Sequence, residues 1–175
     1  DVAARAWFKN QGVAVTQTGG GGFIIPTEGP DQLTLFMQGD LDGVWAVEPW
    51  LSRLVLEAGA EVLVDEKNAL TTVVVASSKA LSERRVLLAA FVKAHAELSQ
   101  WMVDHPAEAK QQVLQEIKAI SGRELSAALI DSSWARLSFG SSTTADEFQE
   151  FVTRAQQVGF LKEAGDVQSL VEEVQ

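Results

Sequence analysis

Apolar residues along the chain follow two spacings, and the change from one to the other predicts an alternation of strands and helices. Short apolar runs typical of buried strands occupy residues 13–15, 23–26, 43–47, 61–64 and 71–76. Apolar residues three or four positions apart predict helices over residues 1–11, 30–38, 49–58, 82–104, 106–121, 125–134 and 144–158, with a last short helix at 166–174. Strands and helices that alternate in this way are typical of an α/β sheet.

The predicted helices carry recognisable end signals. Pro30 and Pro106 lie in expected first turns, and Gly122 follows an expected last turn. Thr144 and Glu147 have the spacing of a capping box. The long helix over residues 82–104, capped by Ser82, is expected to turn five apolar residues inward: Val86, Phe91, Leu98, Trp101 and Met102.

The charge and composition exclude several classes of protein. The 175 residues include 24 acidic and 14 basic ones, for a net charge of −10, so the chain lacks the cationic surface that nucleic-acid binding needs. There is no cysteine, which excludes disulfides, thiolate metal sites and a thiol nucleophile. No apolar run approaches the roughly 20 residues that span a bilayer. We therefore expect a globular protein that binds no nucleic acid.

One stretch of the sequence resembles a known family. Residues 39–50 read GDLDGVWAVEPW, and residues 51–66 continue as LSRLVLEAGAEVLVDE. This stretch resembles the periplasmic solute-binding proteins of ABC importers for nitrate, sulfonate and taurine. Pro30–Phe36 upstream and the helix pair around Trp101 and His105–Ala109 downstream are similar to the same family.

The resemblance implies an incomplete α/β fold of the type II periplasmic-binding-protein kind. Such proteins have two lobes with the ligand between them. Residues 1–66 are expected to form most of the second lobe, and residues 67–175 the return strand and C-terminal helices of the first. The polar break at residues 65–70 fits that boundary. The strands that begin the first lobe are expected to precede Asp1, so the chain is expected to be truncated.

The candidate ligand-binding residues lie in two loops that each precede a helix. In an open α/β sheet, ligands bind at the carboxyl ends of strands, and a helix start favours an anion. Trp45, Glu48, Pro49 and Trp50 form the first candidate loop. Trp50 is expected to pack against the ligand, and Glu48 either accepts from an amine of a zwitterionic ligand or caps the helix. The alternative for Trp45 is that it packs in the hydrophobic core and does not contact a ligand.

The second candidate loop contains Thr27 and Gly29, whose backbone N–H groups are expected to face the ligand; an ordinary polar loop is the alternative. Three other features have simpler interpretations. Gly19–Gly22 lacks the Lys and Ser/Thr of a phosphate-binding loop and is interpreted as a surface turn. His95 and His105 lack the companions of a zinc site. We expect no metal and no cofactor.

The resemblance implies a solute-binding protein. We do not expect an enzyme, because no nucleophile motif or acid–base pair stands out. The expected solute is small and anionic or zwitterionic, and the expected protein partner is an ABC permease. The family implies a periplasmic or otherwise extracytoplasmic location. The alternative hypothesis is a self-associating structural module, a homodimer formed through the surface that the missing lobe leaves exposed.

Overall fold

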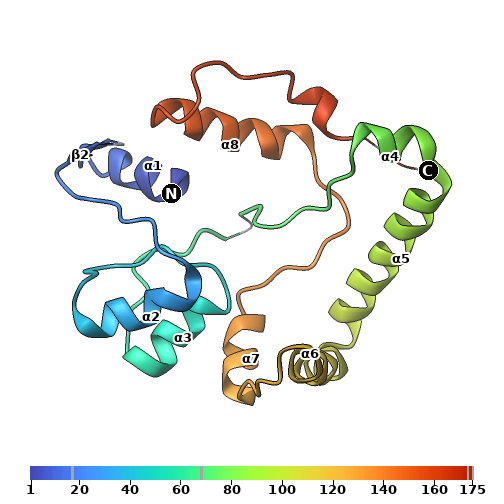
Figure 1. Cartoon of the computed structure of the whole chain (residues 1–175), viewed down its shortest axis with the longest axis horizontal. Coiled ribbons are helices and arrows are strands. Elements are labelled where there is room, and N and C mark those ends of the chain that lie inside the picture. Colours follow the sequence, from blue (N-terminus) through green and yellow to red (C-terminus); the bar gives the residue numbers. More distant parts are fainter. Residues whose placement is uncertain (17, 68, 173, 175) are drawn as a thin grey trace. The chain divides into compact units, whose positions relative to one another are not determined.

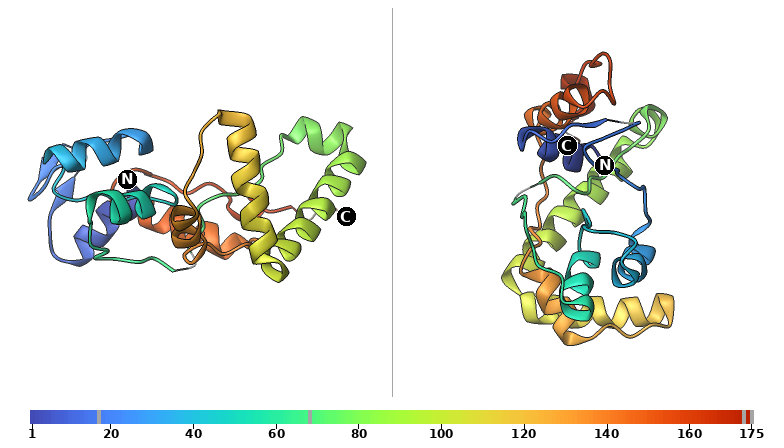
Figure 2. Two further views of the ribbon diagram at one scale, coloured as in Figure 1. Left: turned by 90° about the horizontal axis from the view of Figure 1, so that it is seen from below. Right: turned by 90° about the vertical axis from the view of Figure 1, so that its left-hand side faces the viewer.

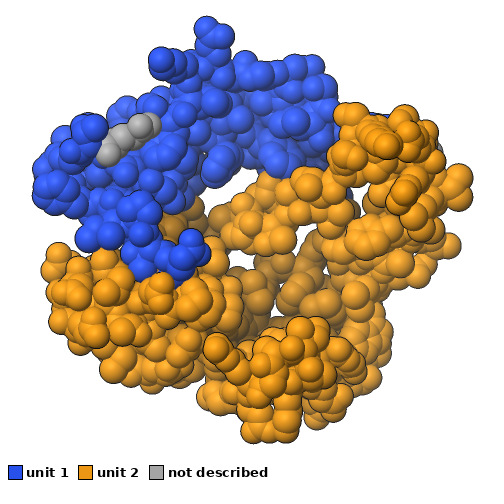
Figure 3. Space-filling model, in the orientation of Figure 1, with its two compact units in different colours: residues 1–28, 142–173 blue, residues 29–141, 174–175 orange. Residues whose placement is uncertain are grey.

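The computed structural model describes residues 1–16, 18–67, 69–172 and 174, and their regular structure is almost entirely helical (Figure 1). The chain divides into two compact units. Residues 1–28 and 142–173 form unit 1, and residues 29–141 form the main part of unit 2 (Figure 3). Each unit therefore has its own core.

Unit 1 is built from two segments, one from the N-terminal part of the chain and one from its C-terminal part. Its elements are helix α1 (Val2–Asn10), the antiparallel pair β1 (Val15–Thr16) and β2 (Gly19–Gly20), helix α8 (Ala145–Gln157) and the short 3-10 helix η1 (Gln168–Leu170). Helix α1 packs on α8 and on β1. The core is small, and Arg5 is buried in it: its Nε donates to the Asp1 carboxylate over 2.6 Å, and its guanidinium lies over the Phe160 ring. A buried charge of this kind is tolerated because it is paired.

Unit 2 is a chain of packed helices. Its elements are α2 (Gly29–Gln38), α3 (Trp50–Ala58), α4 (Ser78–Glu83), α5 (Arg85–Asp104), α6 (Pro106–Ser121) and α7 (Ala127–Trp134). Helix α2 packs on α3, α3 on α7, and α7 on α6. Leu33, Leu54, Ala109 and Leu129 are buried along this series. Helices α5 and α6 diverge from the turn at His105 (Figure 2).

Most of the predicted strands are wrong. Residues 23–26, 43–47, 61–64 and 71–76 form no strand, and β1 and β2 are the strands of the described part of the chain. The valines at 73–75 are exposed, Val75 to 84%. A run of β-branched residues favours the extended conformation locally. A strand forms only where the N–H and C=O groups of the run pair with a neighbouring strand. The architecture is mostly helical, with one two-stranded sheet, and is compatible with an incomplete α/β domain.

The predicted helix over residues 82–104 differs from the structure in two ways. It is interrupted at Arg84, and the preceding turn, α4, is capped by Ser77, whose Oγ accepts from the Ala80 N–H over 3.1 Å. The inward orientation expected of its apolar residues is wrong for three of them, which are exposed to between 50% and 87%: Val86, Phe91 and Leu98. Trp101 and Met102 are half-buried. The spacing marks an apolar face, but burial needs a neighbour along the whole helix, and α5 contacts α4 and α6.

The other helices lie close to their predicted positions. The capping box is confirmed: the Glu147 N–H donates to Thr144 Oγ1 over 3.4 Å, and the Thr144 N–H donates to the Glu147 carboxylate over 2.7 Å. Gly122 ends α6 with a φ of 69°, in the left-handed region that favours glycine. The predicted last helix at 166–174 is shorter, a single 3-10 turn over Gln168–Leu170. Local signals of this kind need no distant partner.

Candidate functional site

The start of α3 is capped by the carboxylate of Glu48. The Glu48–Pro49 peptide bond is cis, and Pro49 is the N-cap residue of the helix. The Glu48 side chain is only 6% exposed, and its Oε2 accepts from the Ser52 N–H over 3.2 Å. The N–H groups of Leu51 and Arg53 also bond within the chain, to the carbonyls of Val47 and Pro49. A helix start normally attracts an anion, and here the chain's own carboxylate takes that place.

Glu48 also faces an arginine that follows α7. Arg136 Nη1 lies 3.7 Å from Glu48 Oε1 and donates to the Ser132 carbonyl and to Ser132 Oγ, each over 3.2 Å. Ser52, which is fully buried, donates through Oγ to Ser132 Oγ over 2.9 Å. We call these four residues (Glu48, Ser52, Ser132 and Arg136) the Glu48–Arg136 cluster. It joins the start of α3 to the end of α7.

The cluster leaves polar atoms without hydrogen bonds. Glu48 Oε1 is buried and has no hydrogen-bond partner among the described residues; the Arg136 ion pair is its polar contact there. The Arg136 side chain is 28% exposed. Its hydrogen bonds to described residues all start from Nη1, so Nε and Nη2 are not used there. The guanidinium is therefore fixed at one edge and free at the other.

Trp50 is held between the start of α2 and its own helix. The indole packs so closely on the backbone of Gly29 that a Cβ at position 29 would lie 2.6 Å from Trp50 Cδ1. The Arg53 guanidinium lies 5.6 Å from the centre of the Trp50 ring. Arg53 in turn donates to both carboxylate oxygens of Glu57, over 2.8 and 3.1 Å, which lowers the pKa of Glu57 and raises that of Arg53.

The structure brings together part of the predicted site. Gly29 contacts Trp50, and Glu48 and Pro49 precede it in unit 2. Trp45 is half-buried in the irregular segment before Glu48. Thr27 belongs to unit 1, where its Oγ1 donates to the Ile25 carbonyl over 3.0 Å.

Sequence reasoning missed the residues that surround Glu48. Ser52 gave a weak signal, since it is an uncharged polar residue in a helix whose other side chains are apolar or charged. Ser132 and Arg136 gave none, because Ser132 lies 80 positions from Ser52 and Arg136 lies 88 positions from Glu48 along the chain. Such contacts are fixed by tertiary packing and leave no local pattern.

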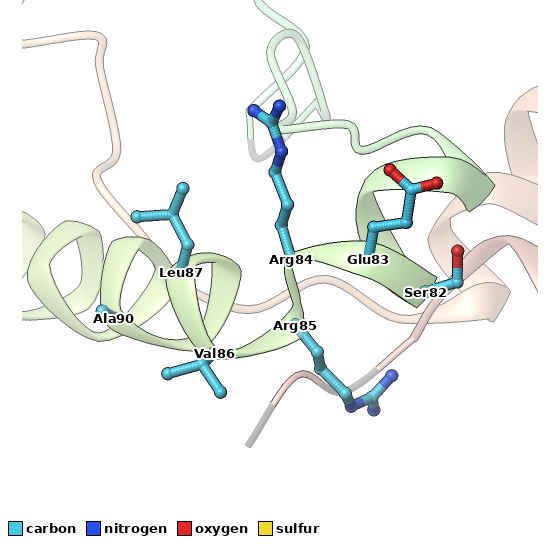
Figure 4. A pocket seen from close by; sticks show the side chains of 7 residues that line it. All are labelled: Ser82, Glu83, Arg84, Arg85, Val86, Leu87 and Ala90. Atoms are coloured by element: carbon cyan, nitrogen blue, oxygen red, sulfur yellow. The ribbon is translucent and has the colours of Figure 1, made fainter.

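An open depression of about 680 Å³ lies where α4 meets α5, lined by Ser82, Glu83, Arg84, Arg85, Val86, Leu87 and Ala90. The side chains of Arg84 and Arg85 point to opposite sides (Figure 4). Binding sites for small ligands usually converge a few polar groups on one point. This depression lacks that convergence, and none of the predicted site residues lines it.

Two structural features bear on other kinds of function. No helix in the part of the chain that the structure describes is long and apolar enough to cross a membrane. Within the same residues, no group of three or more acidic, histidine or cysteine side chains is arranged to hold a metal ion.

A comparison with models of protein families identifies the class of protein to which the chain belongs. The chain is matched over residues 1–118 by the model of a family of solute-binding proteins of the kind that serves ABC importers. The chain belongs to this family, the NMT1-like family, as the resemblance predicted. The matched residues include all six predicted site residues and end before α7. No curated protein and no solved structure matches the chain.

Membership supports a role of the same general kind for this chain. Proteins of this family bind a small solute and deliver it to an ABC permease, and they are of the periplasmic type.

Proposed function

We propose that the chain is the solute-binding component, or part of the solute-binding component, of an ABC importer for a small anionic or zwitterionic compound such as nitrate, a sulfonate or taurine. The observation that carries the proposal is the family match over residues 1–118. In this proposal the protein acts outside the cytoplasm and delivers its solute to the permease. Residues 1–66 and 67–175 belong to two lobes of a type II periplasmic-binding-protein fold.

In unit 2, the proposed solute-lining residues are Trp45, Pro49, Trp50 and Gly29. Trp50 supports this role because its indole is half-buried and held in place by Gly29. Such a rigid aromatic face suits the alkyl part of a small organic anion. Glu48 contributes by fixing the loop, because its carboxylate is buried and bonded to the Ser52 N–H.

Thermal unfolding tests the proposal. The chain is heated alone and with millimolar nitrate, methanesulfonate, taurine or bicarbonate, against sodium chloride at equal ionic strength. A solute at about 100 times its Kd stabilises the folded state by roughly 2.7 kcal/mol, so we expect at least one compound to raise the Tm by several degrees.

Two variants locate the effect. Trp50→Ala is expected to weaken the shift, whereas Trp7→Ala removes a half-buried tryptophan of α1 in unit 1, outside the proposed site, and is expected to retain it. A cooperative transition that no compound moves would contradict the proposal for this panel of solutes.

A second candidate function is the self-associating module. The observation that favours it is the uncharged, β-branched stretch over residues 71–76, which is exposed and forms no strand. Such a stretch offers backbone N–H and C=O groups to another strand, including the same stretch of a second copy.

A further inference from the structure

We propose that Arg136 is an anion-binding residue of this protein, with Glu48 and Ser132 as the residues that position it. The ligand it would take is a small oxoanion group, such as a nitrate, a sulfonate or a carboxylate. The inference rests on the proposed solute-binding function and deepens it, because it assigns the recognition of the negative charge to a residue beyond the family match.

The first argument is the fixed position of the guanidinium. Nη1 is held by both oxygens of Ser132 and lies 3.7 Å from Glu48 Oε1. Ser132 is itself tied to the buried Ser52. A guanidinium fixed at one edge has already lost much of its conformational entropy, so a ligand that binds the other edge has less to immobilise.

The second argument is the use of the donors. Arg136 Nε and Nη2 form the geometry that pairs with two oxygens of one oxoanion, and no described residue accepts from them. Other arginines of the chain show the contrast. Arg53 fills the same two atoms with Glu57, and Arg5 directs them at Asp1.

The third argument concerns the sign of the ligand. Glu48 would be the natural acceptor for an ammonium group, but its Oε1 is buried behind Arg136 and its Oε2 is bonded to the Ser52 N–H. The exposed part of the cluster is the arginine, which is 28% exposed against 6% for Glu48. The cluster therefore presents donors to solvent, and an anionic group fits it better than an ammonium.

The test follows the Nε–H signal of Arg136 by ¹H–¹⁵N NMR, assigned by its loss in Arg136→Lys. The whole chain is titrated with methanesulfonate, nitrate or taurine, with sodium chloride as the reference. We expect at least one oxoanion to move the signal saturably and beyond the effect of chloride. Isothermal titration calorimetry, which does not depend on the Arg136 signal, is expected to show that Arg136→Lys weakens that binding about 10- to 100-fold, because one donor edge is lost.

The matched control is Arg154→Lys. Arg154 is 35% exposed and pairs with Glu150 on α8, in the other unit. The Arg154→Lys substitution is expected to leave the affinity for the oxoanion unchanged. Arg136→Gln serves as a second variant should the lysine form fold poorly, with circular dichroism as the check.

The outcomes separate this inference from the proposed function. An Arg136 signal that no oxoanion moves, or that chloride moves equally, overturns the inference. If a solute nevertheless raises the Tm, the proposed function stands without Arg136. If no solute raises the Tm either, both fail. A saturable oxoanion response of the Arg136 signal, with an affinity that Arg136→Lys weakens in calorimetry, supports the inference even where no Tm shift accompanies it.

Discussion

At the scale of single residues, Glu48 is the side chain whose role depends most on its surroundings. By sequence it precedes a proline and a helix, and both ligand binding and capping fit that position. Its side chain is buried and accepts from the Ser52 N–H, which indicates a structural role at the start of α3. The sequence alone could not identify Arg136 as the partner of Glu48, because these two residues meet only through the packing of α3 on α7.

Gly29 offers a test of the packing around Trp50. A methyl group at this position would overlap the indole ring, so Gly29→Ala forces Trp50 to move. We expect the substitution to lower the free energy of unfolding by about 1–3 kcal/mol, more than the gain in helix propensity returns. Urea unfolding followed by tryptophan fluorescence measures the change.

Gly140→Ala is the control for this substitution, since a Cβ at residue 140 meets no atom within 4 Å. It is expected to leave the unfolding midpoint near that of the parent chain. Equal midpoints for the two variants would mean that Gly29 and Trp50 are not in close contact.

At the scale of elements, helices were predicted well and strands poorly, for a physical reason. The signals that set α8, namely Thr144, Glu147 and the apolar spacing that follows, all act within one or two turns. The run over residues 71–76 has a strong strand preference, but none of the residues that the structure describes pairs with it as a strand. The same difference applies to the candidate site: local sequence marks the loop at Glu48, but it does not mark Ser132 on α7 or Arg136 beyond that helix.

The capping box of α8 predicts a dependence on pH. The Thr144 N–H and the Thr143 hydroxyl donate to Glu147 and lower its pKa in the folded chain below the ordinary value of 4.5. Since the folded value is the lower one, the carboxylate stabilises α8 above pH 4.5. That stabilisation is lost as the pH falls through the folded value.

Thermal unfolding by circular dichroism between pH 6 and pH 3 measures this effect. Glu147→Gln is expected to melt at a lower temperature than the parent chain at pH 6, with the difference shrinking toward pH 3. Glu163→Gln removes an exposed carboxylate that has no hydrogen bond to a described residue, and this variant is expected to show no such difference. A Glu147→Gln deficit that stays constant over the range would exclude the charge as its cause.

At the scale of the whole molecule, the exposed valines predict self-association. Two copies can pair their 71–76 stretches without bringing charges together, although each chain carries a net charge of −10. We expect the chain to sediment as a dimer or larger species at high concentration. Val75→Lys is expected to shift it toward the monomer, because a charge in the paired stretch opposes its approach to an identical strand.

Ile120→Lys is the matched control. Ile120 is 83% exposed, against 84% for Val75, but lies in the last turn of α6, outside the stretch. The Ile120→Lys variant is expected to sediment like the parent chain. A parent chain that remains monomeric at high concentration, or an equal effect of the two lysines, would remove the second candidate function.

The hydroxyl pair of Ser52 and Ser132 has a consequence for how unit 2 folds. It joins residues 80 positions apart, so bringing α3 and α7 together costs loop-closure entropy on the order of 4 kcal/mol. Contacts at such a separation form late and slow folding relative to local helical turns. We therefore expect the Glu48–Arg136 cluster to assemble after the helices between its two halves. Any partial opening that frees α7 would take it apart while leaving those helices intact.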